Sequence, residues 1–141
     1  MIDDDLLELQ IPPEAEFVGT ARLFLAAAGR HFELSEESVA DAKVAVSEVC
    51  AGAIESPRQP EHLKIAIRPG LEALEVEVVP VGTGIEADPP PPVPDTGAAS
   101  FEHIMREPLV HALFPDAAYE PAEHSLRLSL PWELPEEPQE P

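Results

Sequence analysis

The stretch SEESVADAKVAVSEVCAGAIES, residues 35–56, decides the fold because it predicts one long helix with a single buried face. Ser35 is well placed as the N-cap, and the acidic Glu36 and Glu37 suit the positive end of the helix dipole. Pro57 disfavours a helical residue before it, so we expect the helix to end near residue 56. Apolar residues recur at spacings of three and four along about five turns. These residues are Val39, Ala42, Val46, Val49, Cys50 and Ala53.

Two elements are predicted before this helix. In residues 7–11 apolar and polar side chains alternate, which predicts a strand with one buried face that ends at Pro12 and Pro13. Residues 14–28 predict a first helix, and Gly29 is placed to end it. Its apolar face consists of Phe17, Ala21, Phe24, Leu25 and Ala28.

A hairpin is predicted after the long helix. Residues 63–67 and 74–78 both alternate between apolar and polar side chains, and Pro69 and Gly70 mark a turn between them. The stretch from 81 to 99 then has no apolar periodicity, and we expect a proline-rich loop at 85–99.

A third helix and two short strands are predicted near the end of the chain. Ser100 suits the N-cap of the helix, and Pro108 is expected to kink it or to start a new turn. Strands are predicted at 117–120 and 126–130. The expected apolar face of this helix consists of Phe101, Ile104, Met105, Leu109 and Ala112.

This order of elements predicts an α+β fold, in which a mixed or antiparallel sheet carries its helices on one face as a two-layer sandwich. The length of 141 residues suits one domain, which we expect to span residues 1–132. Residues 133–141 are acidic and rich in proline, and they predict a disordered tail.

Composition excludes several classes of function. The formal net charge is −20 and the chain has only eight Lys and Arg residues, which disfavours direct binding to nucleic acids. No apolar run is long enough to span a bilayer, and the single cysteine, Cys50, fits a reducing compartment, so we expect a cytoplasmic protein without membrane contact. The histidines lack the spacing of a metal site, and none is expected.

The segment Asp41–Ile54 resembles the N-box helix of the bacterial anti-sigma-factor serine kinases, which belong to the histidine kinase-like ATPase superfamily. The stretch Ile11–Arg22 is similar to the first strand and helix of that family. Val78–Gly84 stands where its DxGxG loop follows a strand, and Leu109–Leu113 is similar to the helix before its last strands. The resemblance covers roughly residues 6–131.

The resemblance implies a nucleotide site on the long helix, but that site departs from the family's pattern. Glu48 matches the glutamate that positions or activates the attacking group, whereas Gly52 replaces the asparagine that holds magnesium. Residues four apart share a helix face, so both reach one site. Glycine has no side-chain oxygen for magnesium, and it is about 1 kcal/mol less favourable than alanine inside a helix.

The other motifs of the family are also altered. The aspartate that reads adenine aligns with Pro80, which offers neither a carboxylate nor an N–H group, while Gly82 and Gly84 match the two glycines of the motif. In the second glycine-rich box, around 104–108, Ile104 and Arg106 stand where glycines are expected and are expected to obstruct phosphate. Alternatively, Glu48 is a solvated or weakly capped carboxylate and Gly82 and Gly84 are ordinary turn residues.

Three hypotheses follow from this resemblance. The favoured one is a catalytically degenerate domain in transcription regulation that sequesters a sigma factor or a STAS-type antagonist, with no cofactor. The second is an active ATP-dependent serine/threonine kinase with magnesium and Glu48 as its base, and the third is a pocket reused for another small ligand. The family also implies homodimers, for which Leu23 and Val18, outside the main apolar stripe of the first helix, are candidate contacts.

Overall fold

The computed structural model describes residues 6–82 and 97–132, and the side chains from residue 105 onward in the second of these ranges. The predicted tail and most of the predicted proline-rich loop lie outside these residues. In chain order the elements are β1 (Leu7–Ile11), η2 (Ala15–Phe17), α1 (Val18–His31), α2 (Glu36–Glu55), β2 (His62–Pro69), β3 (Ala73–Val81), α3 (Gly97–Leu113), β4 (Ala118–Glu120), η3 (Pro121–Glu123) and β5 (Ser125–Pro131).

The strands form one sheet in the order β1-β2-β3-β5-β4, and every neighbouring pair is antiparallel. The α+β prediction is therefore confirmed, and of its two alternatives the sheet is antiparallel rather than mixed. The register places Val78 between Ile65 on β2 and Leu126 on β5. Side chains directly opposite each other on neighbouring strands point to the same face of the sheet, and all three residues are buried, so they belong to one buried face.

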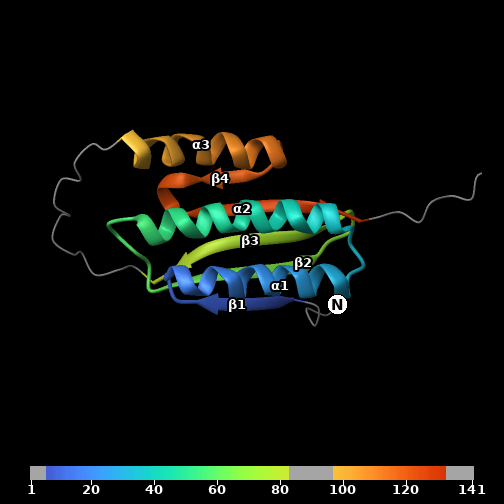
Figure 1. The fold of residues 1–141 in the computed structure, drawn as a ribbon. Helices are drawn as coiled ribbons and strands as arrows, with labels where there is room; N and C mark the ends of the chain where they lie inside the picture. Colours follow the sequence, from blue (N-terminus) through green and yellow to red (C-terminus); the bar gives the residue numbers. More distant parts are fainter. Residues whose placement is uncertain (1–5, 83–96, 133–141) are drawn as a thin grey trace, which may run out of the picture.

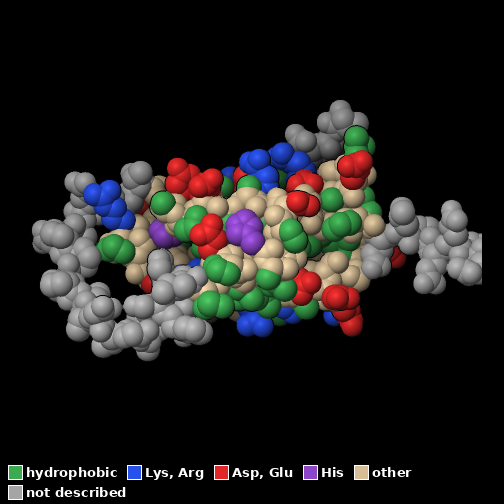
Figure 2. Space-filling model, turned by 90° about the horizontal axis from the view of Figure 1, so that it is seen from above, with side chains coloured by type: hydrophobic (Ala, Val, Ile, Leu, Met, Phe, Trp, Pro, Cys, Tyr) green, Lys and Arg blue, Asp and Glu red, His purple; other side chains and the backbone are tan. Residues whose placement is uncertain are grey.

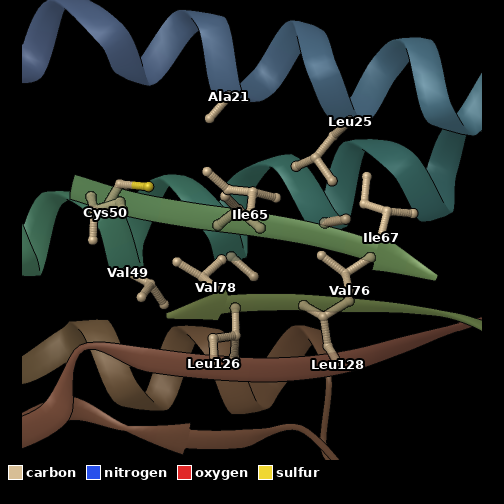
Figure 3. Packing of buried hydrophobic residues seen from close by; sticks show 14 of the residues in the cluster. Ala21, Leu25, Val49, Cys50, Ile65, Ile67, Val76, Val78, Leu126 and Leu128 are labelled. Carbon is tan, nitrogen blue, oxygen red and sulfur yellow. The ribbon is translucent and has the colours of Figure 1, made fainter. Parts of the chain in front are cut away.

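Helices α1 and α2 cover that buried face, and α3 lies beside α2 on the side of β4 (Figure 1). Side chains from both helices and from β2, β3 and β5 meet in a single core (Figure 3). The predicted apolar stripe of α2 is buried there except for Val39, which stays partly exposed. Burying one large aliphatic side chain is worth about 2 kcal/mol, so this shared core is the main source of stability.

The predicted start of α2 is confirmed. Ser35 has an extended backbone, and its hydroxyl oxygen accepts a hydrogen bond of 3.1 Å from the backbone N–H of Ser38. The end of α1 differs from the prediction, because the helix continues past Gly29 to His31. A Cβ at position 29 would overlap the side chain of Val39, so Gly29 serves the close approach of α1 and α2 rather than helix termination.

Helix α3 differs most from the prediction. It begins at Gly97, so Ser100 lies inside it and is not its N-cap, and it continues through Pro108 to Leu113. The predicted apolar face is wrong at Met105, Leu109 and Ala112, which are exposed, and the side chains of Phe101 and Ile104 lie outside the described part. The inward residues are Arg106 and Val110, one helical turn apart. Their contacts with the rest of the domain offset the roughly 3 kcal/mol by which a proline disfavours a helix interior.

Within the residues that the structure describes, no helix is both long enough and apolar enough to cross a bilayer.

Candidate functional site

The side of α2 that faces α3 carries Glu48, Gly52 and Glu55. These residues are spaced by four and three, so they lie one above another along the same helix face. The two carboxylates are partly exposed, with 33% of the Glu48 side chain and 57% of the Glu55 side chain accessible to solvent. Gly52 leaves a gap between them where a side chain would otherwise project.

Arg106 from α3 fills this gap. Its Nε donates a hydrogen bond of 3.3 Å to Oε1 of Glu48, and its Nη2 donates one of 3.2 Å to Oε2 of Glu55. An ideal Cβ built on Gly52 would lie 3.3 Å from Nη1 of the same guanidinium. The Arg106 side chain is only 7% exposed, and among the described residues it is the only charged one that is buried. The guanidinium therefore lies directly on the helix at Gly52.

The charge of Arg106 also reaches the chain around β4. Burial lowers the pKa of His124, and the positive charge of Arg106 lowers it further. Burial raises the pKa of Tyr119; Arg106 opposes this rise, and the carboxylates of Glu107 and Glu48 add to it. The positive charge of Arg106 is thus felt beyond its two ion pairs on α2, as far as the region of β4.

Pro80 lies in the last part of β3, and Gly82 follows the end of this strand. Pro80 is opposite Leu63 of β2, beyond the segment in which β3 pairs with β5, where a strand tolerates a residue without an N–H group. Gly82 has a φ of 79°, and a Cβ there would approach Oε2 of Glu61 to 2.7 Å. This geometry favours the interpretation of Gly82 as a turn residue. Gly84 lies outside the described residues.

Glu48 and Gly52 lie on one face of α2, as predicted from their spacing, but the ion pairs on that face were not predicted. The alternative of a solvated or weakly capped Glu48 did not include its partner: the carboxylate is 33% exposed and also accepts a hydrogen bond from Arg106. Glu55 was not considered, although its spacing of three from Gly52 was a usable signal. Arg106 was expected only to obstruct phosphate. Instead it reaches α2 and contacts Glu48 and Glu55, which precede it in the sequence by 58 and 51 positions.

This set of side chains does not suit a magnesium ion. Magnesium prefers oxygen ligands in a regular octahedron, and Gly52 provides no side-chain oxygen. The Glu48 carboxylate already accepts a hydrogen bond from a guanidinium, whose positive charge repels a metal cation at the same place.

Residues 11–130 match the family of the histidine kinase-like ATPase domain. The serine-protein kinase RsbW of Bacillus velezensis is 32% identical over 87 residues, and that of Bacillus subtilis is 30% identical over 87 residues; both alignments cover 60% of this chain and 54% of the relative. RsbW of Bacillus thuringiensis is 28% identical over 82 residues. The aligned part thus spans about half the length of these relatives. Because the family match covers most of the sequence, the chain belongs to the histidine kinase-like ATPase domain family.

Proposed function

We propose that this domain is a regulatory protein-binding domain that acts without ATP. In this proposal it sequesters a sigma factor or a STAS-type antagonist in the cytoplasm, and it does not phosphorylate that partner. The similarity to the RsbW serine-protein kinases supports the anti-sigma type of partner. Because the similarity spans only about half of those proteins, the partner itself has to be established by experiment.

The contact of Arg106 with Glu48, Glu55 and Gly52 carries this proposal. Phosphoryl transfer depends on metal and backbone groups that position the phosphates and on a free group beside the nucleophile. Here a guanidinium engages the one matching carboxylate and covers the position of the missing metal ligand. The same contact weighs against a pocket for another small ligand beside this part of α2.

The surface on the α3 side suits a protein partner. Met105 and Leu109 lie one turn apart on the outer side of α3 and are 45% and 38% exposed. Hydrophobic and acidic side chains are interspersed over this side of the molecule (Figure 2). Exposed apolar side chains with a polar rim are typical of a protein contact, and the net charge of −20 favours encounter with a basic one.

The first test is calorimetric titration with ATP in magnesium buffer. We expect no saturable heat at ATP concentrations up to about 1 mM, which corresponds to binding weaker than about −4 kcal/mol. RsbW of Bacillus subtilis, titrated in the same buffer, is the positive control. Micromolar affinity of the wild-type chain would refute the proposal.

The second candidate function is an active serine/threonine kinase, which the retained Glu48 favours. It requires phosphate transfer from ATP to a STAS-type antagonist and the loss of that transfer in Glu48→Gln. Absence of transfer by the wild-type domain would end this alternative.

A homodimer through α1 is part of the proposal. Leu23 is 72% exposed on this helix, whereas Val18 is partly buried and is the weaker candidate. Light scattering is expected to give twice the chain mass of 15.2 kDa for the wild type and a single chain for Leu23→Glu. Leu71→Glu is the matched control, because Leu71 is 99% exposed between β2 and β3. Equal masses for both variants would exclude α1 as the contact.

A further inference from the structure

Two unfavourable features of the sequence meet at one point in the structure. Glycine is less favourable than alanine inside a helix, yet Gly52 lies within α2. Arginine is rarely buried unless it is paired, yet Arg106 is only 6% exposed. The Arg106 guanidinium lies on the α2 backbone at Gly52. The glycine therefore explains how the arginine can be buried there, and the arginine explains why a glycine stands inside the helix.

We propose that Arg106 is an internal cation that holds α3 on α2, and that Gly52 is the gap that admits it. In this proposal the two ion pairs of Arg106 fix α3 against α2. This inference concerns how α3 is held, and it stands whether or not the domain binds a sigma factor.

The geometry requires an arginine in this place. The guanidinium is a planar fork, and here its Nε and Nη2 reach two carboxylates that lie about two helical turns apart on α2. A lysine has one point charge and cannot reach Glu48 and Glu55 with separate nitrogens in the same way.

The geometry also requires a small residue at position 52. The distance of 3.3 Å between Nη1 and an ideal Cβ on Gly52 is shorter than ordinary van der Waals contact. An alanine at this position therefore requires the guanidinium to shift by a few tenths of an ångström, which strains its hydrogen bonds to the carboxylates.

The contact is local in its effect. On α3, Arg106 and Val110 are one turn apart and both are buried, so this helix has one polar and one apolar anchor. The two carboxylates remain partly exposed, and solvent weakens such ion pairs. Loss of Arg106 is therefore expected to release α3 more than it unfolds the sheet.

Hydrogen exchange of the backbone amides tests how α3 is held. In the wild type without nucleotide, we expect the amides of residues 105–107 and 109–113 to be protected, and Arg106→Ala to speed their exchange about tenfold or more. Arg106→Lys is expected to behave more like the alanine variant than like the wild type. Arg127→Ala is the matched control, since Arg127 pairs with Glu77 at 3.0 Å on the exposed face of the sheet. Unchanged exchange of α3 in Arg106→Ala would overturn the proposal.

A double-mutant cycle tests the role of Gly52. Helix propensity alone predicts that Gly52→Ala raises the folding equilibrium constant about fivefold. We expect that gain in full in the Arg106→Ala background and less than that gain when Arg106 is present, because the guanidinium then has to shift. A fivefold gain in both backgrounds would contradict the proposal. Should Arg106→Ala fail to fold, the size of the change in Gly52→Ala alone decides: a gain of less than about fivefold supports the proposal, and the full gain of about fivefold contradicts it.

These outcomes are separate from the proposed function. Binding of ATP in calorimetry would refute the nucleotide-independent function, whereas the exchange of α3 and the cycle are measured without nucleotide or partner. A domain with a tightly held α3 and no protein partner would support the role of Arg106 and contradict the proposed function.

Discussion

Ile65→Ala is expected to lower the free energy of unfolding by about 3 kcal/mol, because it leaves a cavity in the centre of the core. Ile65 lies in the middle of β2, pairs with Leu9 and Val78 on the neighbouring strands and has no exposed surface. Figure 3 shows it between the helices and the sheet, close to side chains from several elements. Urea denaturation measures the effect, with fluorescence of Trp132, the single tryptophan, as the probe.

Lys64→Ala is the matched control for this experiment. Lys64 is the preceding residue of β2, its side chain points to the other face of the sheet, and its 3.7 Å ion pair with Glu8 is partly exposed. We expect a change within about 0.5 kcal/mol, since surface substitutions and exposed ion pairs contribute little. Equal effects of the two substitutions would mean that the helices do not cover this face of the sheet.

Cys50 is expected to react with a thiol reagent about a thousandfold more slowly in the folded domain at pH 8 than in urea. Burial raises the pKa of the Cys50 thiol from 9.0 to about 12, which lowers the fraction of reactive thiolate by that factor. The side chain also has no exposed surface, so the reagent cannot reach it without an opening of α2. Absorbance of the released reagent anion follows the reaction, and rapid labelling of the folded domain would place Cys50 outside the core.

The same shift makes stability depend on pH. The folded domain holds the thiol proton more tightly than the unfolded chain, so this contribution is fully present below about pH 9 and is lost as the pH rises toward 12. Each pH unit in this range is worth about 1.4 kcal/mol. Cys50→Ala is expected to be less stable at neutral pH, but its free energy of unfolding is expected to fall less steeply with pH above 9. The pKa of Tyr119 is also raised, but Tyr119 is present in both proteins. The difference between the two slopes therefore reports on Cys50. Equal slopes would contradict the assignment.

The elements that were predicted well from the sequence are those in which the apolar residues follow a single period. The stripe of α2 and the alternation in β2, β3 and β5 reflect burial on a single face, so the pattern and the structure have one cause. Local signals failed where a neighbouring element decides the outcome. Gly29 suggested a helix end, but it admits Val39 of α2.

The candidate site was predictable only in part for the same reason. Glu48 and Gly52 are close in sequence, and helix geometry alone places them on one face. The partner of Glu48 is 58 residues away on α3, and the apolar residues of that helix suggested a different inner face. The position of Arg106 depends on two carboxylates and a gap on another helix, which no periodic pattern records.

Arg106 is joined to the chain by covalent bonds, and this distinguishes it from any ion or cofactor. A dissociable effector is present in proportion to its concentration, so a protein that needs one responds to changes in the metabolic state of the cell. A side chain cannot diffuse away, be hydrolysed or be exchanged for a diphosphate. If the proposed function holds, the output of this domain follows its own synthesis and degradation instead of the ratio of ATP to ADP.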